Sequence, residues 1–206
     1  MSEENSDRTK RNEVFTGAKN PQGLPTRNVM KDDFGFEVPV EAVPLPSRGI
    51  TYPADSPMHG KETISIRAMT AREEDILTSK ALIKKGTVVT ELLKSCVVDE
   101  GFDADSALTG DRNALMVALR ITGYGVGYKV EVDCPSCGQR SKQEFNLAEL
   151  PIKRLDIAPI SPGANLFECE LPVTGKKVKW RFLTGVEEKE ISQMQERKKK
   201  QGMLND

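Results

Sequence analysis

The chain has 206 residues, of which 30 are basic and 31 acidic, giving a formal net charge of −1. This length suits one sizeable domain with appended segments, and the balanced charge excludes the overall basic excess that holds nucleic acid. Hydrophobic residues make up 37% of the chain and aromatic residues 5%. Such modest values are expected if part of the chain stays outside a core until it meets a partner.

The sequence has no apolar run approaching the ~20 residues that a membrane-spanning helix needs. Residues 1–19 are polar and charged, unlike the apolar stretch of a signal peptide. We therefore expect the protein to begin in a cytoplasm. In that compartment four cysteines favour buried thiols or metal ligands over a disulfide framework.

Residues 1–35 are predicted to form an extended or disordered arm, because their apolar residues are scattered and show no sustained period. The arm either drapes over a neighbouring subunit or remains a free terminus. The following stretch, residues 36–46, has prolines at positions 39, 44 and 46. Because proline removes backbone donors and biases the preceding residue to extended geometry, we predict a stiff extended strip there.

A mixed body of strands and helices is predicted for residues 36–133. Polar and apolar residues alternate over residues 62–67, which predicts a strand. About three helices should follow, at 70–84, 87–96 and 113–121. A capping box of Thr70 and Glu73 begins the first helix, and Thr109 or Asp111 should cap the third. The third is the most hydrophobic segment and is expected to lie in the core.

The C-terminal part is predicted to be rich in antiparallel strands, which makes the fold class α+β. Residues 128–133 alternate as a strand that leads directly into the β-rich region 134–185. Further strands are expected at 143–147, 166–171 and 177–183, with a hairpin turn at 172–175. Residues 186–206 should form a charged helical tail.

The sequence Cys134-Pro-Ser-Cys137, followed by Gly138, carries the sharpest chemical signal. Two thiolates two residues apart can face one zinc ion when the turn between them is tight. A second pair with the same spacing is missing from the chain. Cys169 is a candidate third ligand, and Cys96 or His59 a candidate fourth. The alternatives are a free dithiol turn, a disulfide, or a turn that keeps this shape without metal.

Catalysis is not expected. The Cys134–Cys137 motif lies between strand-like stretches instead of opening a helix in a βαβ unit, which argues against a thiol oxidoreductase. His59 is the single histidine and lies in a predicted loop. The glycine-rich stretch 123–127 follows a helix and precedes a strand, the reverse of the order that binds phosphate. The basic run 197–200 is surrounded by glutamates and is interpreted as a solvated helix end.

The order of several short motifs resembles the T4-type baseplate hub protein family of contractile-tailed bacteriophages. The resemblance covers about residues 36 to 190 and rests on these stretches: Pro44-Leu-Pro-Ser-Arg-Gly-Ile-Thr-Tyr52, Ile66-Arg-Ala-Met-Thr-Ala-Arg-Glu-Glu74, Leu93-Lys-Ser-Cys-Val97, Leu119-Arg-Ile-Thr-Gly-Tyr-Gly125, Cys134-Pro-Ser-Cys-Gly138 and Leu171-Pro-Val-Thr-Gly175.

The resemblance implies a structural or assembly component of the baseplate hub that has no catalytic activity. Its partners would be other baseplate and tail proteins in a symmetric assembly, with no nucleic acid, membrane or small-molecule substrate. The protein would be found in the host cytoplasm during assembly and then in the virion tail baseplate. The alternative from the motifs alone is a zinc-ribbon adaptor that binds nucleic acid or a transcription complex.

Overall fold

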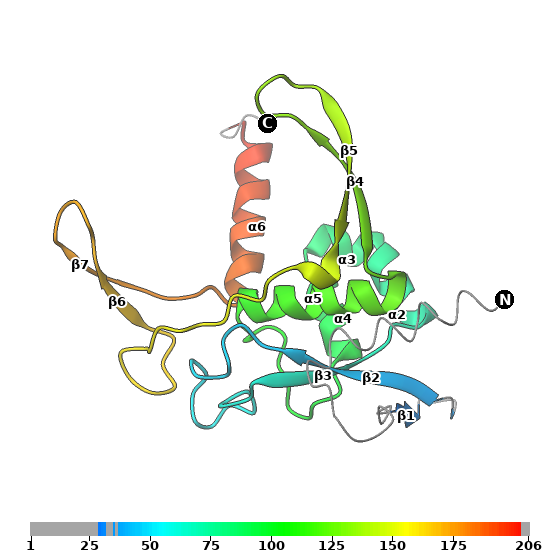
Figure 1. Cartoon of the computed structure of the whole chain (residues 1–206), viewed down its shortest axis with the longest axis horizontal. Coiled ribbons are helices and arrows are strands. Elements are labelled where there is room, and N and C mark those ends of the chain that lie inside the picture. Colours follow the sequence, from blue (N-terminus) through cyan, green and yellow to red (C-terminus); the bar gives the residue numbers. More distant parts are fainter. Residues whose placement is uncertain (1–28, 32–34, 36, 203–206) are drawn as a thin grey trace.

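The computed structural model describes residues 29–31, 35 and 37–202 (Figure 1). The arm predicted for residues 1–35 therefore lies almost wholly outside the described residues, and its described part includes the short strand β1 (Val29–Lys31). The described part contains antiparallel sheets and five α-helices, which confirms the α+β class. None of its helices is long and apolar enough to cross a membrane.

The segment predicted as a stiff strip is a true strand, β2 (Glu37–Pro44), at the centre of a three-stranded sheet. Its first residues pair with β1, and the rest pair with β3 (Thr63–Arg67) from Val40 onward. Pro39 and Pro44 thus lie at the two ends of the β2–β3 ladder. Proline cannot donate to a ladder and is best accepted at such ends, so this sequence is compatible with a central strand.

The helix predicted from Thr70 to about Lys84 is wrong in one respect: it is two helices, α2 (Ala71–Thr78) and α3 (Lys80–Lys85). The break lies at Ser79, whose backbone is extended and whose side chain accepts a hydrogen bond from the Leu82 amide. Serine competes for backbone donors in this way, which favours caps over helix interiors. The capping box is confirmed, since the Thr70 N–H donates to the Glu73 carboxylate at 2.8 Å.

The next two helices are α4 (Val88–Cys96) and α5 (Thr109–Tyr124). The first lies close to its predicted range, whereas α5 extends beyond the predicted residues 113–121 at both ends. The predicted cap of α5 is wrong. Leu108 occupies the cap position and no side chain caps the helix. Asp111 is buried and bonds to a distant turn instead. Gly125 occupies the C-cap position of α5, which ends at Tyr124.

The core lies between the three-stranded sheet and the layer formed by α2–α5 (Figure 1). The sheet contributes the alternate residues Ile64 and Ile66, each 1% exposed. One face of α4 and one face of α5 pack against them through these residues: Leu92, Leu93, Cys96, Leu115, Ala118 and Leu119. The expectation that residues 113–121 belong to the core is confirmed. Spacings of three and four residues place these side chains on one face of each helix.

The C-terminal part consists of two hairpins and a helix. The first hairpin pairs β4 (Gly127–Asp133) with β5 (Arg140–Asn146), followed by the short helix η1 (Leu147–Glu149). The second pairs β6 (Phe167–Glu170) with β7 (Lys177–Trp180), and α6 (Gly185–Lys200) follows. The predicted strands exist with shifted ends, and the predicted helical tail is confirmed as far as Lys200. The boundaries proposed at 35, 133 and 185 stay predictions.

Candidate functional site

The β4–β5 hairpin and α6 project to the same side of the core, and the β6–β7 hairpin projects to another side (Figure 1). In β4 and β5 every residue except Val130 is exposed, and in β6 every residue except Phe167. The side chains of residues 190–199 on α6 are all exposed. A two-stranded hairpin or a helix that lacks tertiary packing is only marginally stable in water. These three elements therefore offer surfaces that another molecule can cover.

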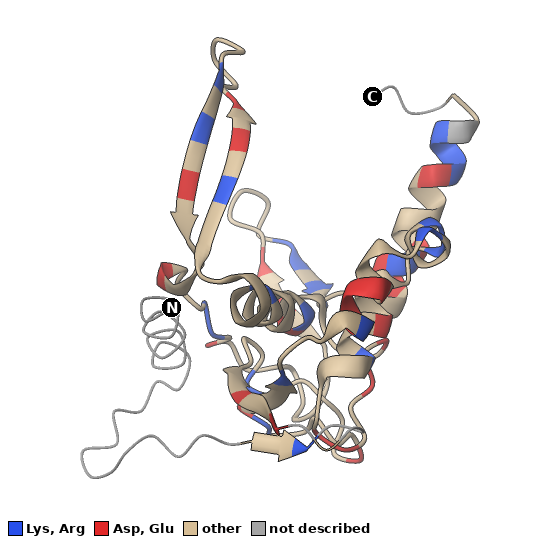
Figure 2. Cartoon of the chain, turned by 90° about the vertical axis from the view of Figure 1, so that its right-hand side faces the viewer, with Lys and Arg blue, Asp and Glu red and all other residues tan. Residues whose placement is uncertain are grey.

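The β4–β5 hairpin is held to the core at its base. The Arg120 guanidinium donates to the Gly125 carbonyl at 3.1 Å and lies 5.0 Å from the centre of the Tyr124 ring. Further along, Tyr128 and Phe145 face each other across the strands and are 42% and 48% exposed. Above them, charged side chains of both signs alternate toward the tip (Figure 2). The hairpin thus presents an apolar pair near its base and a charged ladder above it.

The β6–β7 hairpin is anchored by aromatic rings. Phe167 stacks on Trp180 with the ring centres 4.6 Å apart, and both rings meet Phe182 edge-on at 5.2 Å. Asn165 fixes Phe182 further, because its amide group both donates to and accepts from the Phe182 backbone. Beyond this anchor the hairpin carries Val173 at its turn, with 94% of the side chain exposed.

Helix α6 is joined to the core through its first turn. Thr184 and Glu187 form a second capping box, and Thr184 bridges to Leu108 as an isolated β-pair. The Gly185 N–H donates to the Ala107 carbonyl at 3.1 Å. A Cβ on Gly185 would lie 2.4 Å from the Arg112 guanidinium and 2.8 Å from the Ala104 carbonyl oxygen. Glycine is thus required for the close approach of α6 to the core.

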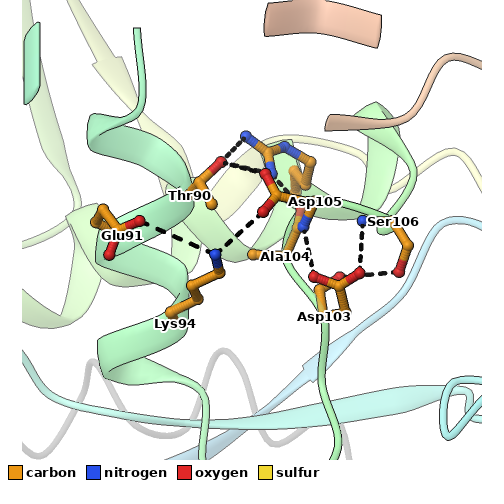
Figure 3. A network of polar contacts seen from close by, with 8 residues as sticks. Thr90, Glu91, Lys94, Asp103, Ala104, Asp105 and Ser106 are labelled. Carbon is orange, nitrogen blue, oxygen red and sulfur yellow. Dashed lines mark hydrogen bonds and ion pairs between the residues drawn. The ribbon is translucent and has the colours of Figure 1, made fainter. Parts of the chain in front are cut away.

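A polar network holds the loop beneath α6 in place (Figure 3). Lys94 of α4 donates to Asp105 at 3.0 Å, and this hydrogen bond raises the pKa of the lysine. Arg112, buried in α5, donates to the Thr90 hydroxyl and the Ala104 carbonyl, and its Nε lies 3.3 Å from Glu188 of α6. The network therefore links α4, the 103–106 loop, α5 and the start of α6.

A second buried cluster holds the turn after β2. The Asp111 carboxylate accepts hydrogen bonds from the Ser47 amide at 2.9 Å, the Ser47 hydroxyl at 2.6 Å and the Tyr52 hydroxyl at 2.7 Å. Burial and the nearby Asp111 charge raise the pKa of Tyr52. The Tyr52 oxygen in turn accepts from the Leu108 amide at 3.0 Å. All these partners belong to the chain itself, and they fix the turn to the N-terminal end of α5.

Two of the hollows on the described surface differ in the chemistry of their lining. An apolar groove of about 640 Å³ runs between β2, α5 and residues 147–154, and includes Val43, Val117 and Leu150. A separate hollow of about 440 Å³ between α3 and α6 is lined mainly by basic side chains: Lys84, Lys85, Lys189 and Arg197, with Glu196 among them. The two surfaces differ in character and suit partners of different chemistry.

The predicted metal ligands are only partly brought together. Cys134 and Cys137 lie in the loop that joins β4 to β5, and the Cys137 and Ser136 amides donate to the Cys134 sulfur and lower the pKa of that thiol. Cys169 lies on the other hairpin. No group of three or more His, Cys, Asp or Glu side chains within the described residues could hold a metal ion.

The two candidate fourth ligands are engaged elsewhere. Cys96 is fully buried in the core, and burial raises the pKa of its thiol to about 12. The His59 Nδ1 lies 2.6 Å from the Tyr52 carbonyl oxygen. A zinc ion at the loop of Cys134 and Cys137 stays a prediction, and the described residues of one chain supply two thiols to it.

The sequence was then compared with known proteins. The family model described as "T4 bacteriophage base plate protein" matches residues 50–159, more than half of the chain. The chain belongs to this family. The resemblance noted from the sequence is thereby confirmed for the baseplate. No curated protein and no solved structure is significantly similar to the chain.

The part of this baseplate protein that matches the family model contains β3, α2–α5 and the whole β4–β5 hairpin. The loop of Cys134 and Cys137 is therefore within the region that the family model covers, whereas β6–β7 and α6 lie outside it. Membership gives the chain a structural role in a phage baseplate, where its partners are other baseplate proteins.

Several residues that hold this baseplate protein together were missed by the sequence reasoning. Asp111 was considered only as a helix cap, and its partners Ser47 and Tyr52 lie 64 and 59 positions away. The second capping box was also missed, although Thr184 three residues before Glu187 is its sequence signature. The Asp111 cluster left no comparable local signal.

Proposed function

We propose that the chain is a non-catalytic structural or assembly component of the hub region in the baseplate of a contractile phage tail. It acts by protein–protein contact with neighbouring tail proteins in a symmetric assembly. It first meets them in the host cytoplasm, while the tail is being built. The observation that carries this proposal is the set of three projecting elements, β4–β5, β6–β7 and α6, on one compact core.

The exposed apolar side chains of these elements support contact with protein partners. Phe145, Val173 and Met194 lie on different projections and are 48%, 94% and 55% exposed. Covering such side chains removes apolar surface from water at about 25 cal/mol per Å². The same contacts would supply the packing that each projection lacks in the isolated chain.

The buried polar clusters support a role without catalysis. Asp111 accepts three hydrogen bonds from Ser47 and Tyr52, and Glu73 is fully buried against Arg67. Each carboxylate is thus occupied by side chains that hold the fold. A general base needs a free acceptor within reach of a substrate proton.

The proposal is tested with a phage whose copy of this gene is inactivated and supplied from a plasmid. We expect tail assembly to fail without the plasmid and to recover with it. Mass spectrometry of purified tails then separates two versions of the role. A fixed copy number that matches tail symmetry indicates a structural subunit, and absence from finished tails indicates an assembly factor. Normal tails in the absence of the protein would overturn both versions.

The alternative, a zinc-ribbon adaptor that binds nucleic acid or a transcription complex, rests on the loop of Cys134 and Cys137 and on the basic run 197–200. Acidic side chains of α6 accompany that run (Figure 2). Binding through phosphate contacts weakens steeply with salt, because condensed counterions are released. The purified chain is expected to show no salt-sensitive retention on DNA or RNA columns. Retention at low salt that is lost as salt rises would favour the alternative.

A further inference from the structure

The loop that joins β4 to β5 has the geometry of half a zinc site. The Cys134 N–H donates to the Gln139 carbonyl at 3.0 Å, and the Gly138 N–H donates to the Cys134 carbonyl at 2.8 Å. Gly138 has φ of +70°, a conformation that a residue with a side chain rarely adopts. The loop is therefore a tight turn, and two thiolates two residues apart can face one metal ion when the turn between them is tight.

The half site is incomplete within the chain. Structural zinc is almost always bound by four ligands in tetrahedral geometry. Cys169 lies on the other hairpin, and the described residues contain no cluster of three or more ligating side chains. The missing two ligands must therefore come from another molecule if this loop is to hold zinc as a structural site does.

The position of the loop makes such a completion feasible. It forms the tip of a hairpin that projects from the core (Figure 1), and Cys137 is exposed while Cys134 is partly so. Residues 134–139 carry no charged side chain other than the thiols themselves. Nothing in the described tip would prevent a second tip from approaching it.

We propose that two copies of the chain join tip to tip through one zinc ion, bound by Cys134 and Cys137 of each copy. Each loop supplies two of the four thiolates, and a two-fold axis through the metal gives every ligand an equivalent partner.

The charges below the tip are compatible with this pairing. The two strands carry three basic and three acidic side chains, so each hairpin is neutral: Lys129, Glu131, Asp133, Arg140, Lys142 and Glu144. Several of them pair across the strands, with Arg140 2.9 Å from Asp133 and 3.9 Å from Glu131. Two neutral hairpins meet without net repulsion, and acidic side chains of one hairpin can pair with basic side chains of the other.

The site is tested on the purified full chain, kept reduced so that no disulfide can link two copies. Light scattering after size-exclusion chromatography gives the mass, and elemental analysis gives the zinc content. With zinc present we expect a dimer that carries one zinc ion for every two chains. Removing zinc with a chelator should return a zinc-free monomer, and adding zinc back should restore the dimer.

Three variants locate the site. Cys134→Ser and Cys137→Ser should each lose both the bound zinc and the dimer. Cys169→Ser, a change of the same kind at an exposed cysteine on the other hairpin, should keep both. Because the loop lies outside the core, all three variants should, without zinc, unfold at the temperature of the zinc-free unaltered chain.

Three results would overturn the site: no bound zinc, one zinc ion per chain in a monomer, or zinc retained by Cys134→Ser and Cys137→Ser. These measurements use the purified chain alone. Their failure would leave the hub role unaffected, and a failure of the hub role would leave the zinc site standing.

Discussion

At the scale of single residues, two buried carboxylates define the strongest local constraints. Glu73 accepts hydrogen bonds from Arg67, Ser95 and Thr70, at distances of 2.5 to 3.2 Å. Burial alone would raise the pKa of Glu73, but these hydrogen bonds outweigh it and lower the pKa from 4.5 to about 2. Asp111 likewise accepts several hydrogen bonds, and it joins the turn at Ser47 to helix α5.

The lowered pKa of Glu73 predicts a pH-dependent stability. A carboxyl whose pKa is lower in the folded chain stabilises the fold above its ordinary pKa of 4.5, and that contribution is lost as the pH falls toward 2. Glu73→Gln should therefore be less stable than the unaltered chain at neutral pH, by about 3 kcal/mol. Urea unfolding at a series of pH values should show this gap closing below pH 4.5. Glu74→Gln, at the exposed neighbouring position, should show no such gap; a gap for Glu73→Gln that did not change with pH would contradict the account.

Asp111 gives a second prediction at this scale. Asp111→Asn keeps the size of the side chain but removes the charge that three donors share. We expect the free energy of unfolding to fall by about 2–4 kcal/mol, because hydrogen bonds to a buried charge are strong and their loss leaves donors unpaired. Asp156→Asn, the same change at an exposed position, should alter it by less than about 0.5 kcal/mol. Chemical denaturation measures both, and equal effects of the two changes would count against the cluster.

At the scale of elements, the existence of the C-terminal strands and turns was predicted, whereas the ends of strands and helices were shifted. Alternation at residues 128–133 and the turn at 172–175 located both C-terminal hairpins, since a period of two and a turn residue are local signals. The break at Ser79 was missed because residues 70–84 all tolerate a helix, and one serine hydrogen bond decides the outcome. Cys169 lies on β6, in the second hairpin, as the strand pattern predicted.

Replacing glycine by alanine is predicted to have opposite effects on stability at two positions. Gly185→Ala should destabilise the chain by about 1–3 kcal/mol, because the added methyl group overlaps Arg112 and the Ala104 carbonyl. Gly110→Ala, in the first turns of α5, meets nothing within 4 Å and should stabilise the chain by about 0.5–1 kcal/mol. Thermal unfolding of both variants tests the close contact between α6 and the core. The same sign for both substitutions would contradict it.

At the scale of the whole molecule, a compact core presents two hairpins and a helix (Figure 1). The core could be predicted in outline, because its helices and strand have clear apolar periodicity. The direction in which the projections leave the core could not be predicted. Alternation and turn residues predict a hairpin, but they do not show whether that hairpin packs against the core. The partners that would cover these surfaces belong to other chains of the baseplate. Contacts with another chain leave no recognisable pattern in the sequence of this one.

The exposed face of α6 gives a prediction that separates folding from assembly. Ile191 and Met194 are 40% and 55% exposed, so changing both to Glu should alter the free energy of unfolding by less than about 0.5 kcal/mol. Recruitment into the assembling tail should fall about tenfold if burial worth about 1.4 kcal/mol is lost. The matched double change of Ser192 and Gln195 to Glu adds the same charge on the same helix and should leave recruitment intact. Quantitative mass spectrometry of assembling tails measures recruitment; equal losses in both doubles would indicate a general effect of charge.

The central claim is that the chain acts through contacts made by β4–β5, β6–β7 and α6. Cross-linking mass spectrometry on hub complexes isolated from infected cells during tail assembly tests it most directly, because it captures both a lasting subunit and a transient assembly factor. Lysines of the projections, such as Lys142, Lys177 and Lys198, are predicted to link to neighbouring proteins, whereas Lys61 and Lys94, paired with Asp99 and Asp105, should link mainly within the chain. Links to other proteins that arise mainly from Lys61 and Lys94, with none from the projections, would contradict the account.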